Sequence, residues 1–108
     1  MKLNEYQTLA MRTANPKCKI LSNVGLGLAG EAGEAADLIK KHLHHEHELD
    51  KDHLAKELGD VAWYIALGCE VIGIDMETVL QRNIDKLKAR YPEGFEVDKS
   101  LHRADGDI

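Results

Sequence analysis

A regular apolar stripe interrupted by an acid is the feature of this sequence that most constrains its fold. Between residues 24 and 38, side chains recur at alternating steps of four and three, the spacing that turns one side of a helix toward a neighbour. The stripe consists of Val24, Leu28, Glu31, Ala35 and Leu38. A carboxylate in such a packed seam is costly unless something compensates its charge. The stripe therefore predicts a packed helix that carries a charged site on its inner side.

Two pairs of acids share one spacing. Glu31 and Glu34 lie in GEAGEAADLIKK, and Glu57 and Asp60 lie in KELGDVAWYIA. A separation of three residues places both members of a pair on one helix face. Four acids at close range repel one another without cations, whereas Mg2+ prefers carboxylate oxygens and bridges them to substrate phosphates. We predict that these four acids bind Mg2+, or Mn2+ in its place, although each acid taken singly would pass as a solvated surface residue.

The rest of the chain also shows helical periodicity, with no strand pattern and no internal repeat. Proline, glycine and capping signals predict helices over residues 4–14, 22–45, 50–73 and 75–91. Ser22 or Asn23 is the expected cap of the second helix, and Asp50 that of the third. The tail, residues 95–108, is expected to be extended or partly disordered. These elements predict an all-α fold, a hairpin-based four-helix bundle within a single domain of residues 1–108.

Apolar spacing also predicts which faces of the later helices are buried. The expected seam of the third helix consists of Leu54, Leu58, Val61, Ile65, Gly68 and Ile72. The expected buried residues of the fourth are Met76, Val79, Leu80, Ile84 and Leu87. The second helix is apolar on more than one side, so we expect oligomerisation to complete the bundle. That helix also contains four glycines, which indicate either close helix–helix approach or room for a ligand: Gly25, Gly27, Gly30 and Gly33.

Composition narrows the function classes further. The 108 residues carry a net charge of -5, which argues against a nucleic-acid partner bound through a basic surface but not against a nucleotide substrate. No run approaches the roughly 20 apolar residues of a membrane span, and the N-terminus lacks a signal-peptide core. Of the two cysteines, Cys69 lies in an apolar helical run and is expected to be a buried free thiol. These features predict a cytoplasmic protein without a membrane partner.

Three segments together resemble a known family: GLAGEAGEAADLIKK, HLAKELGDVAWYIA and NIDKLKARYPEGF. They are similar to the MazG-like nucleoside triphosphate pyrophosphohydrolases, of the all-α NTP pyrophosphatase superfamily that includes dCTP pyrophosphatase. The resemblance covers roughly residues 23–95. The family pattern is E-E-x-x-E followed later by E-x-x-D, and it is matched here by Glu31, Glu34, Glu57 and Asp60. Gly30 stands where the family has its first glutamate, as in the compact MazG-like and dCTPase branches, so the substrate preference of full MazG proteins does not carry over.

The resemblance implies hydrolysis of a (d)NTP between its α and β phosphates, giving NMP and pyrophosphate, in nucleotide-pool housecleaning. It implies a catalytic site in which the four acids hold Mg2+, in a homodimer or homotetramer. Asn83, Lys86 and Arg90 share one face of the fourth helix. Under the resemblance, Lys86 and Arg90 are expected to hold phosphate oxygens, and Asn83 phosphate or sugar; without it, they would pass as a solvated stripe.

Three further residues are candidates for substrate binding. Lys40 could reach phosphates or merely complement the end of its helix. Trp63, the only tryptophan, could stack on a nucleobase or simply pack in the core. Asn23 could contact the nucleotide or act only as a cap.

Two alternatives to this enzyme remain. A di-iron carboxylate bundle requires two Glu-x-x-His elements, and neither Glu31 nor Glu57 has a histidine three residues later. A non-catalytic helical dimerisation or metal-binding module on the same scaffold would explain the apolar seams but not four converging acids. The histidines of HLHHEH are expected to form a solvated turn or an adventitious transition-metal site: His42, His44, His45 and His47.

Overall fold

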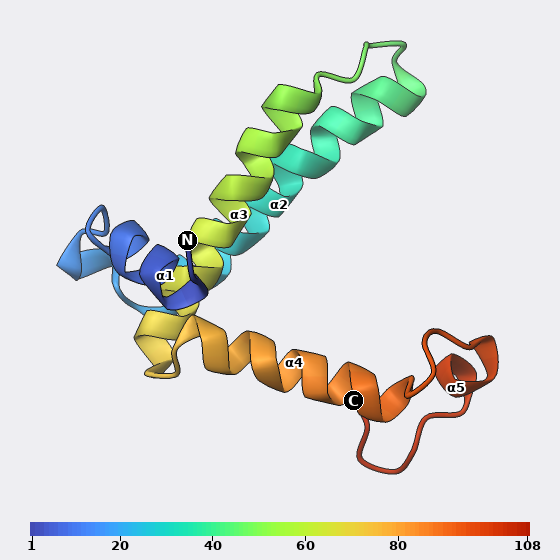
Figure 1. Ribbon diagram of the computed structural model, residues 1–108. Helices are drawn as coiled ribbons and strands as arrows, with labels where there is room; N and C mark the ends of the chain where they lie inside the picture. Colours follow the sequence, from blue (N-terminus) through green and yellow to red (C-terminus); the bar gives the residue numbers. More distant parts are fainter. The chain divides into compact units, whose positions relative to one another are not determined.

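The computed structural model describes all of residues 1–108, and its regular elements are all helices (Figure 1). The five α-helices are α1 (Leu3–Met11), α2 (Leu21–His44), α3 (Lys51–Ile72), α4 (Met76–Arg90) and α5 (Val97–Leu101). A short 3-10 helix, Pro16–Cys18, lies between α1 and α2. The predicted all-α class is therefore confirmed. None of these helices combines the length and the apolarity that crossing a membrane requires.

The chain forms two compact units. Residues 1–76 contain α1, α2 and α3, and residues 77–108 contain nearly all of α4 together with α5. Within the first unit, α2 and α3 lie side by side as an antiparallel hairpin, and α1 packs against α3 (Figure 1). The hairpin agrees with the sequence prediction, whereas a single domain over residues 1–108 stays a prediction.

Local signals set the ends of α3 as expected. The Asp50 side chain accepts a hydrogen bond from the main-chain N–H of His53 at 3.0 Å, which satisfies a free donor at the helix start. Gly73 ends the helix with a φ of 72°, a left-handed conformation that favours glycine. The start of α2 differs from the prediction, because the helix begins at Leu21 without a side-chain cap. Asn23 is not its cap, since its side-chain amide donates instead to the carbonyl of Cys18 at 3.0 Å.

One glycine of α2 explains how closely the two hairpin helices approach. A β-carbon at Gly27 would overlap the ring of Tyr64 on α3, so only glycine fits there. A β-carbon at Gly25, Gly30 or Gly33 would meet nothing within 4 Å. Close helix approach therefore accounts for Gly27 and for none of the other three.

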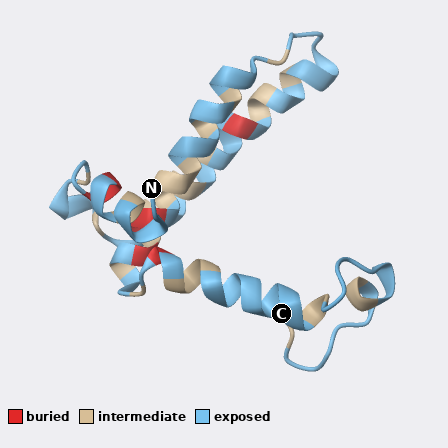
Figure 2. Cartoon of the chain, in the orientation of Figure 1, coloured by how far each residue is buried: buried red, intermediate tan, exposed pale blue.

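The core is small and lies where α1, α3 and the start of α4 meet, as the red segments of Figure 2 show. Its members are mostly of modest size: Ala10, Met11, Ala66, Leu67, Cys69 and Met76, with Ala35 buried separately in the hairpin. Cys69 is buried and free, as predicted.

The predicted seams were wrong at several positions. On α3, Leu58, Ile65 and Ile72 are exposed by 57%, 37% and 55%, and on α4 Ile84 and Leu87 are also exposed. The last turns of α3 bury Ala66, Leu67 and Cys69 instead. Both α1 and α2 contact α3, so its buried face differs from the single stripe that was predicted. An apolar face of the hairpin is thus left without a partner within this chain.

The tail also differs from the extended or partly disordered segment that was predicted. It contains the short helix α5, and its last residues return to α4 within the second unit (Figure 1). An ion pair between Arg90 and Asp107 fixes this return. A contact of this kind depends on two charged groups and leaves no periodic signal in the sequence.

Candidate functional site

The α2–α3 hairpin brings three of the predicted acids together. Glu31 comes from α2, and Glu57 and Asp60 come from neighbouring turns of one face of α3. Each of these residues, the carboxylate triad below, offers an oxygen, and the three oxygens lie within 4.8 Å of one another. Glu31 and Glu57 are partly buried and Asp60 is exposed. The antiparallel pairing of the two helices is what places acids 26 to 29 residues apart in the sequence at one site.

Glu34, the fourth predicted acid, lies outside the carboxylate triad. It is exposed one turn farther along α2, and its charge still acts on Glu31. The structure therefore brings three of the four acids into mutual contact range.

The carboxylate triad is electrostatically strained without a cation. The pKa of Glu31 is raised above its ordinary value, chiefly by desolvation and next by the charge of Asp60 and contact with Glu57. Carboxylate oxygens are the only ligand atoms of the triad, and they suit a hard divalent cation such as Mg2+ or Mn2+. The donor set thus fits the metal that the sequence predicts.

His53 is a neighbour of the triad that sequence reasoning did not identify. Its Nε2 atom lies 3.2 Å from Oε1 of Glu57, one turn away on α3. This arrangement resembles the outer partners that orient carboxylate ligands at metal sites. The spacing of four residues between His53 and Glu57 was the signal available in the sequence.

An aromatic wall lies next to the carboxylate triad. Glu31, Asp60, Trp63 and Tyr64 line a cavity of about 330 Å3. The two rings pack edge to face, with centroids 5.0 Å apart. The indole N–H of Trp63 donates to Oγ1 of Thr13 at 2.9 Å. Trp63 thus lines this cavity together with Tyr64, which follows it in the sequence, and stacking of Trp63 on a nucleobase stays a prediction.

Lys40 and Asn23, by contrast, make local contacts. Lys40 pairs with Asp37 at 3.1 Å, and the same carboxylate pairs with Lys41 at 2.8 Å. Hydrogen bonds from Lys41 and Lys40 hold the pKa of Asp37 below its ordinary value. Asn23 is bonded to the Cys18 carbonyl. Neither Lys40 nor Asn23 lines the cavity beside the carboxylate triad.

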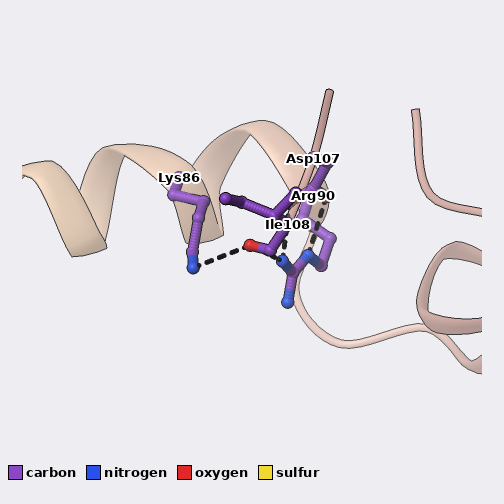
Figure 3. Close-up of polar contacts among 4 residues, drawn as sticks. All are labelled: Lys86, Arg90, Asp107 and Ile108. Atoms are coloured by element: carbon purple, nitrogen blue, oxygen red, sulfur yellow. Dashed lines mark hydrogen bonds and ion pairs between the residues drawn. The ribbon is translucent and has the colours of Figure 1, made fainter. Parts of the chain in front are cut away.

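The three candidates on α4 belong to the second unit. Asn83 and Lys86 are exposed, and Arg90 is mostly buried. Lys86 and Arg90 point toward the end of the tail, where both contact Ile108 and Arg90 also binds Asp107 (Figure 3).

The histidines at the hairpin turn do not gather into a three-ligand metal group. Nδ1 of His42 lies 2.9 Å from the main-chain oxygen of His47, so this contact serves the turn itself.

The chain is similar to a known protein family over most of its length. Residues 21–95 match the family model of the MazG nucleotide pyrophosphohydrolase domain, a stretch that includes the whole hairpin and α4. The Gene 37 protein of Mycobacterium phage L5 is 42% identical over 78 residues, which is 68% of this chain and 68% of that protein. No solved structure shows significant similarity to the chain.

Proposed function

Because the chain belongs to the MazG nucleotide pyrophosphohydrolase family, we propose that it hydrolyses the α–β anhydride bond of a (d)NTP. Water adds across that bond, and NMP and pyrophosphate are the products. The observation that carries the proposal is the carboxylate triad, in which Glu31, Glu57 and Asp60 offer oxygens within 4.8 Å of one another. A role in clearing unwanted nucleotides from the pool is the setting we infer for such a reaction.

The triad would hold Mg2+ or Mn2+, with Glu34 as a further acid close by. When bound, the cation supplies positive charge that offsets the charge of the substrate phosphates. A carboxylate oxygen of the triad that is not used as a ligand orients the attacking water and accepts its proton. His53 holds Glu57 in place by their 3.2 Å contact.

The remaining substrate groups find partners of matching chemistry. The cavity beside the triad offers the nucleobase two aromatic rings, those of Trp63 and Tyr64. Lys86 and Arg90 supply cationic donors for phosphate oxygens, and Asn83 on the same helix supplies an amide for phosphate or sugar. Lys40 and Asn23 stay candidates for substrate binding, although neither lines the cavity beside the triad.

The exposed apolar face of the hairpin supports self-association. Leu26, Leu58, Ile65 and Ile72 are large side chains with between 37% and 76% of their surface exposed. Burying such a face against a second copy removes apolar area from water. We infer that a homodimer or homotetramer completes the bundle.

A product analysis tests the proposed reaction. Protein with Mg2+ is incubated with a panel of canonical and modified NTPs and dNTPs, and pyrophosphate is separated from phosphate. We expect pyrophosphate and NMP from one or a few substrates, and no product when EDTA removes the metal. Absence of turnover with both Mg2+ and Mn2+ would instead favour the non-catalytic module.

A further inference from the structure

The second unit contains a cationic cavity that is separate in the sequence from the carboxylate triad. It has a volume of about 460 Å3, and α4, α5 and the tail line it. Four basic side chains contribute to its wall against two side-chain carboxylates: Lys86, Arg90, Lys99 and Arg103 against Asp105 and Asp107. In a chain whose net charge is -5, this is a local excess of positive charge that suits an anion.

Arg90 lines this cavity and binds the tail through an ion pair. Its side chain is only 9% exposed, and its guanidinium binds both oxygens of Asp107, through Nε at 2.8 Å and Nη2 at 2.6 Å (Figure 3). A planar guanidinium offers this two-pronged geometry equally to a carboxylate and to a phosphate. Asp107 therefore stands where two oxygens of a phosphate would bind.

A third oxygen completes the arrangement. The main-chain oxygen of Ile108 accepts from Nζ of Lys86 at 3.0 Å and from Nη2 of Arg90 at 3.3 Å. The tail thus presents three oxygens to two cations, as a phosphate group does. Lys99 and Arg103 line the same cavity without forming ion pairs, so they remain available to further anionic oxygens.

Lys86 and Arg90 are the phosphate donors of the proposed function. We propose that Asp107 and Ile108 occupy their phosphate position as an internal substitute, which a polyphosphate must displace. The inference rests on the proposed function, because that function assigns Lys86 and Arg90 to the phosphates of the substrate. The chemical class of the ligand is a phosphate-bearing polyanion, from a nucleoside triphosphate or from free pyrophosphate. The tail then competes with the phosphate ligand, and a stronger ion pair between Asp107 and Arg90 weakens binding of that ligand more.

The charge of the Asp107 carboxylate determines how a ligand can displace the tail. The bond from Arg90 holds the pKa of Asp107 below its ordinary value, so the carboxylate stays charged near neutral pH. The tail is therefore not released by protonation under those conditions, and an incoming anion must compete for the same guanidinium.

The test measures binding of pyrophosphate by calorimetry in EDTA, where the acidic triad has no cation through which to bind it. We expect Asp107→Asn to bind pyrophosphate about tenfold more tightly than the unaltered protein, because the strongest tail contact is weakened. Adding Arg90→Gln to Asp107→Asn should abolish that gain. Asp105→Asn is the matched control, because it removes one charge from the same cavity without touching Arg90.

Equal affinity of Asp107→Asn and the unaltered protein would overturn the proposal, as would an equal gain from Asp105→Asn. Circular dichroism establishes that each variant is folded.

A second experiment, at saturating Mg2+, identifies the source of the phosphate. A lower KM in Asp107→Asn assigns the site to the substrate, whereas an unchanged KM with stronger inhibition by pyrophosphate assigns it to the free anion. Loss of all turnover would reject the proposed function and leave the binding result intact.

Discussion

Gly27 on α2 lies so close to the ring of Tyr64 on α3 that no β-carbon fits between them. Glu31 follows Gly27 by one helical turn, and Asp60 precedes Tyr64 by one turn. The contact therefore sets the separation of the two helices next to the carboxylate triad. Packing and site geometry are coupled at this point, since any change in helix separation also moves the acids apart.

Gly27→Ala is expected to destabilise the fold by about 1–3 kcal/mol, because the Tyr64 ring must move or the helices must part. This loss exceeds the roughly 1 kcal/mol that alanine gains over glycine in a helix. Gly25→Ala is the control, because its β-carbon meets nothing and the propensity gain alone remains. Urea unfolding measures both, and equal stability of the two variants would show that the Tyr64 contact is not restrictive.

Asp60→Asn and Glu34→Gln compare an acid of the triad with the predicted acid that lies outside it. Both are expected to lower Mg2+-dependent turnover by about a hundredfold or more, since even outer partners of metal ligands cost about 10–100-fold. Binding of Mn2+ without substrate should weaken only in Asp60→Asn, because Glu34 lies outside the triad. Mn2+ titration followed by electron paramagnetic resonance reports this difference. Undiminished turnover in Asp60→Asn would remove the triad from the mechanism.

The raised pKa of Glu31 predicts how stability depends on pH. In metal-free protein the folded state binds the carboxyl proton of Glu31 more tightly than the unfolded chain does. The pKa of the glutamate in the unfolded chain is about 4.5. The free energy of unfolding should therefore fall as pH rises above 4.5 and level off beyond the raised pKa. Mg2+ should restore stability on the alkaline side of this window and have little effect on the acid side.

Glu31→Gln isolates the contribution of Glu31 to the pH dependence of stability. In EDTA at pH 7.5 the variant should melt at a higher temperature than the unaltered protein, because one repelling charge is gone. It should also lose the stabilisation by Mg2+. Melting curves at several pH values test both statements, and parallel curves for the two proteins would contradict the assigned origin of the shift.

Thr13 is expected to influence nucleotide affinity through Trp63. Its hydroxyl accepts the indole N–H at 2.9 Å and so fixes the ring beside the triad. Thr13→Val keeps the shape but removes the acceptor, and should raise KM several-fold with little change in kcat. Thr8→Val is the matched control, because the Thr8 hydroxyl bonds only to the carbonyl of Asn4 in its own helix. The emission of the single tryptophan follows nucleotide binding directly.

The sequence by itself determined the parts of this protein that depend on neighbouring residues. Periodicity located the helices, and Asp50 and Gly73 marked the ends of α3 because capping depends on a few adjacent groups. The spacing between Glu57 and Asp60 placed both on one face for the same reason. The family resemblance carried the predicted site residues and reaction class, and the match over residues 21–95 confirms the family.

Tertiary structure alone decided which of these residues meet. The pairing of α2 with α3 selected Glu31, Glu57 and Asp60 and left Glu34 aside, because helix separation and rotation are set by contacts such as Gly27 with Tyr64. The same packing leaves Leu58 and other predicted seam residues exposed. The bond between Arg90 and Asp107 joins residues 17 positions apart. No local pattern encodes such a contact, since its free energy comes from charge and burial in the folded chain rather than from the order of residues.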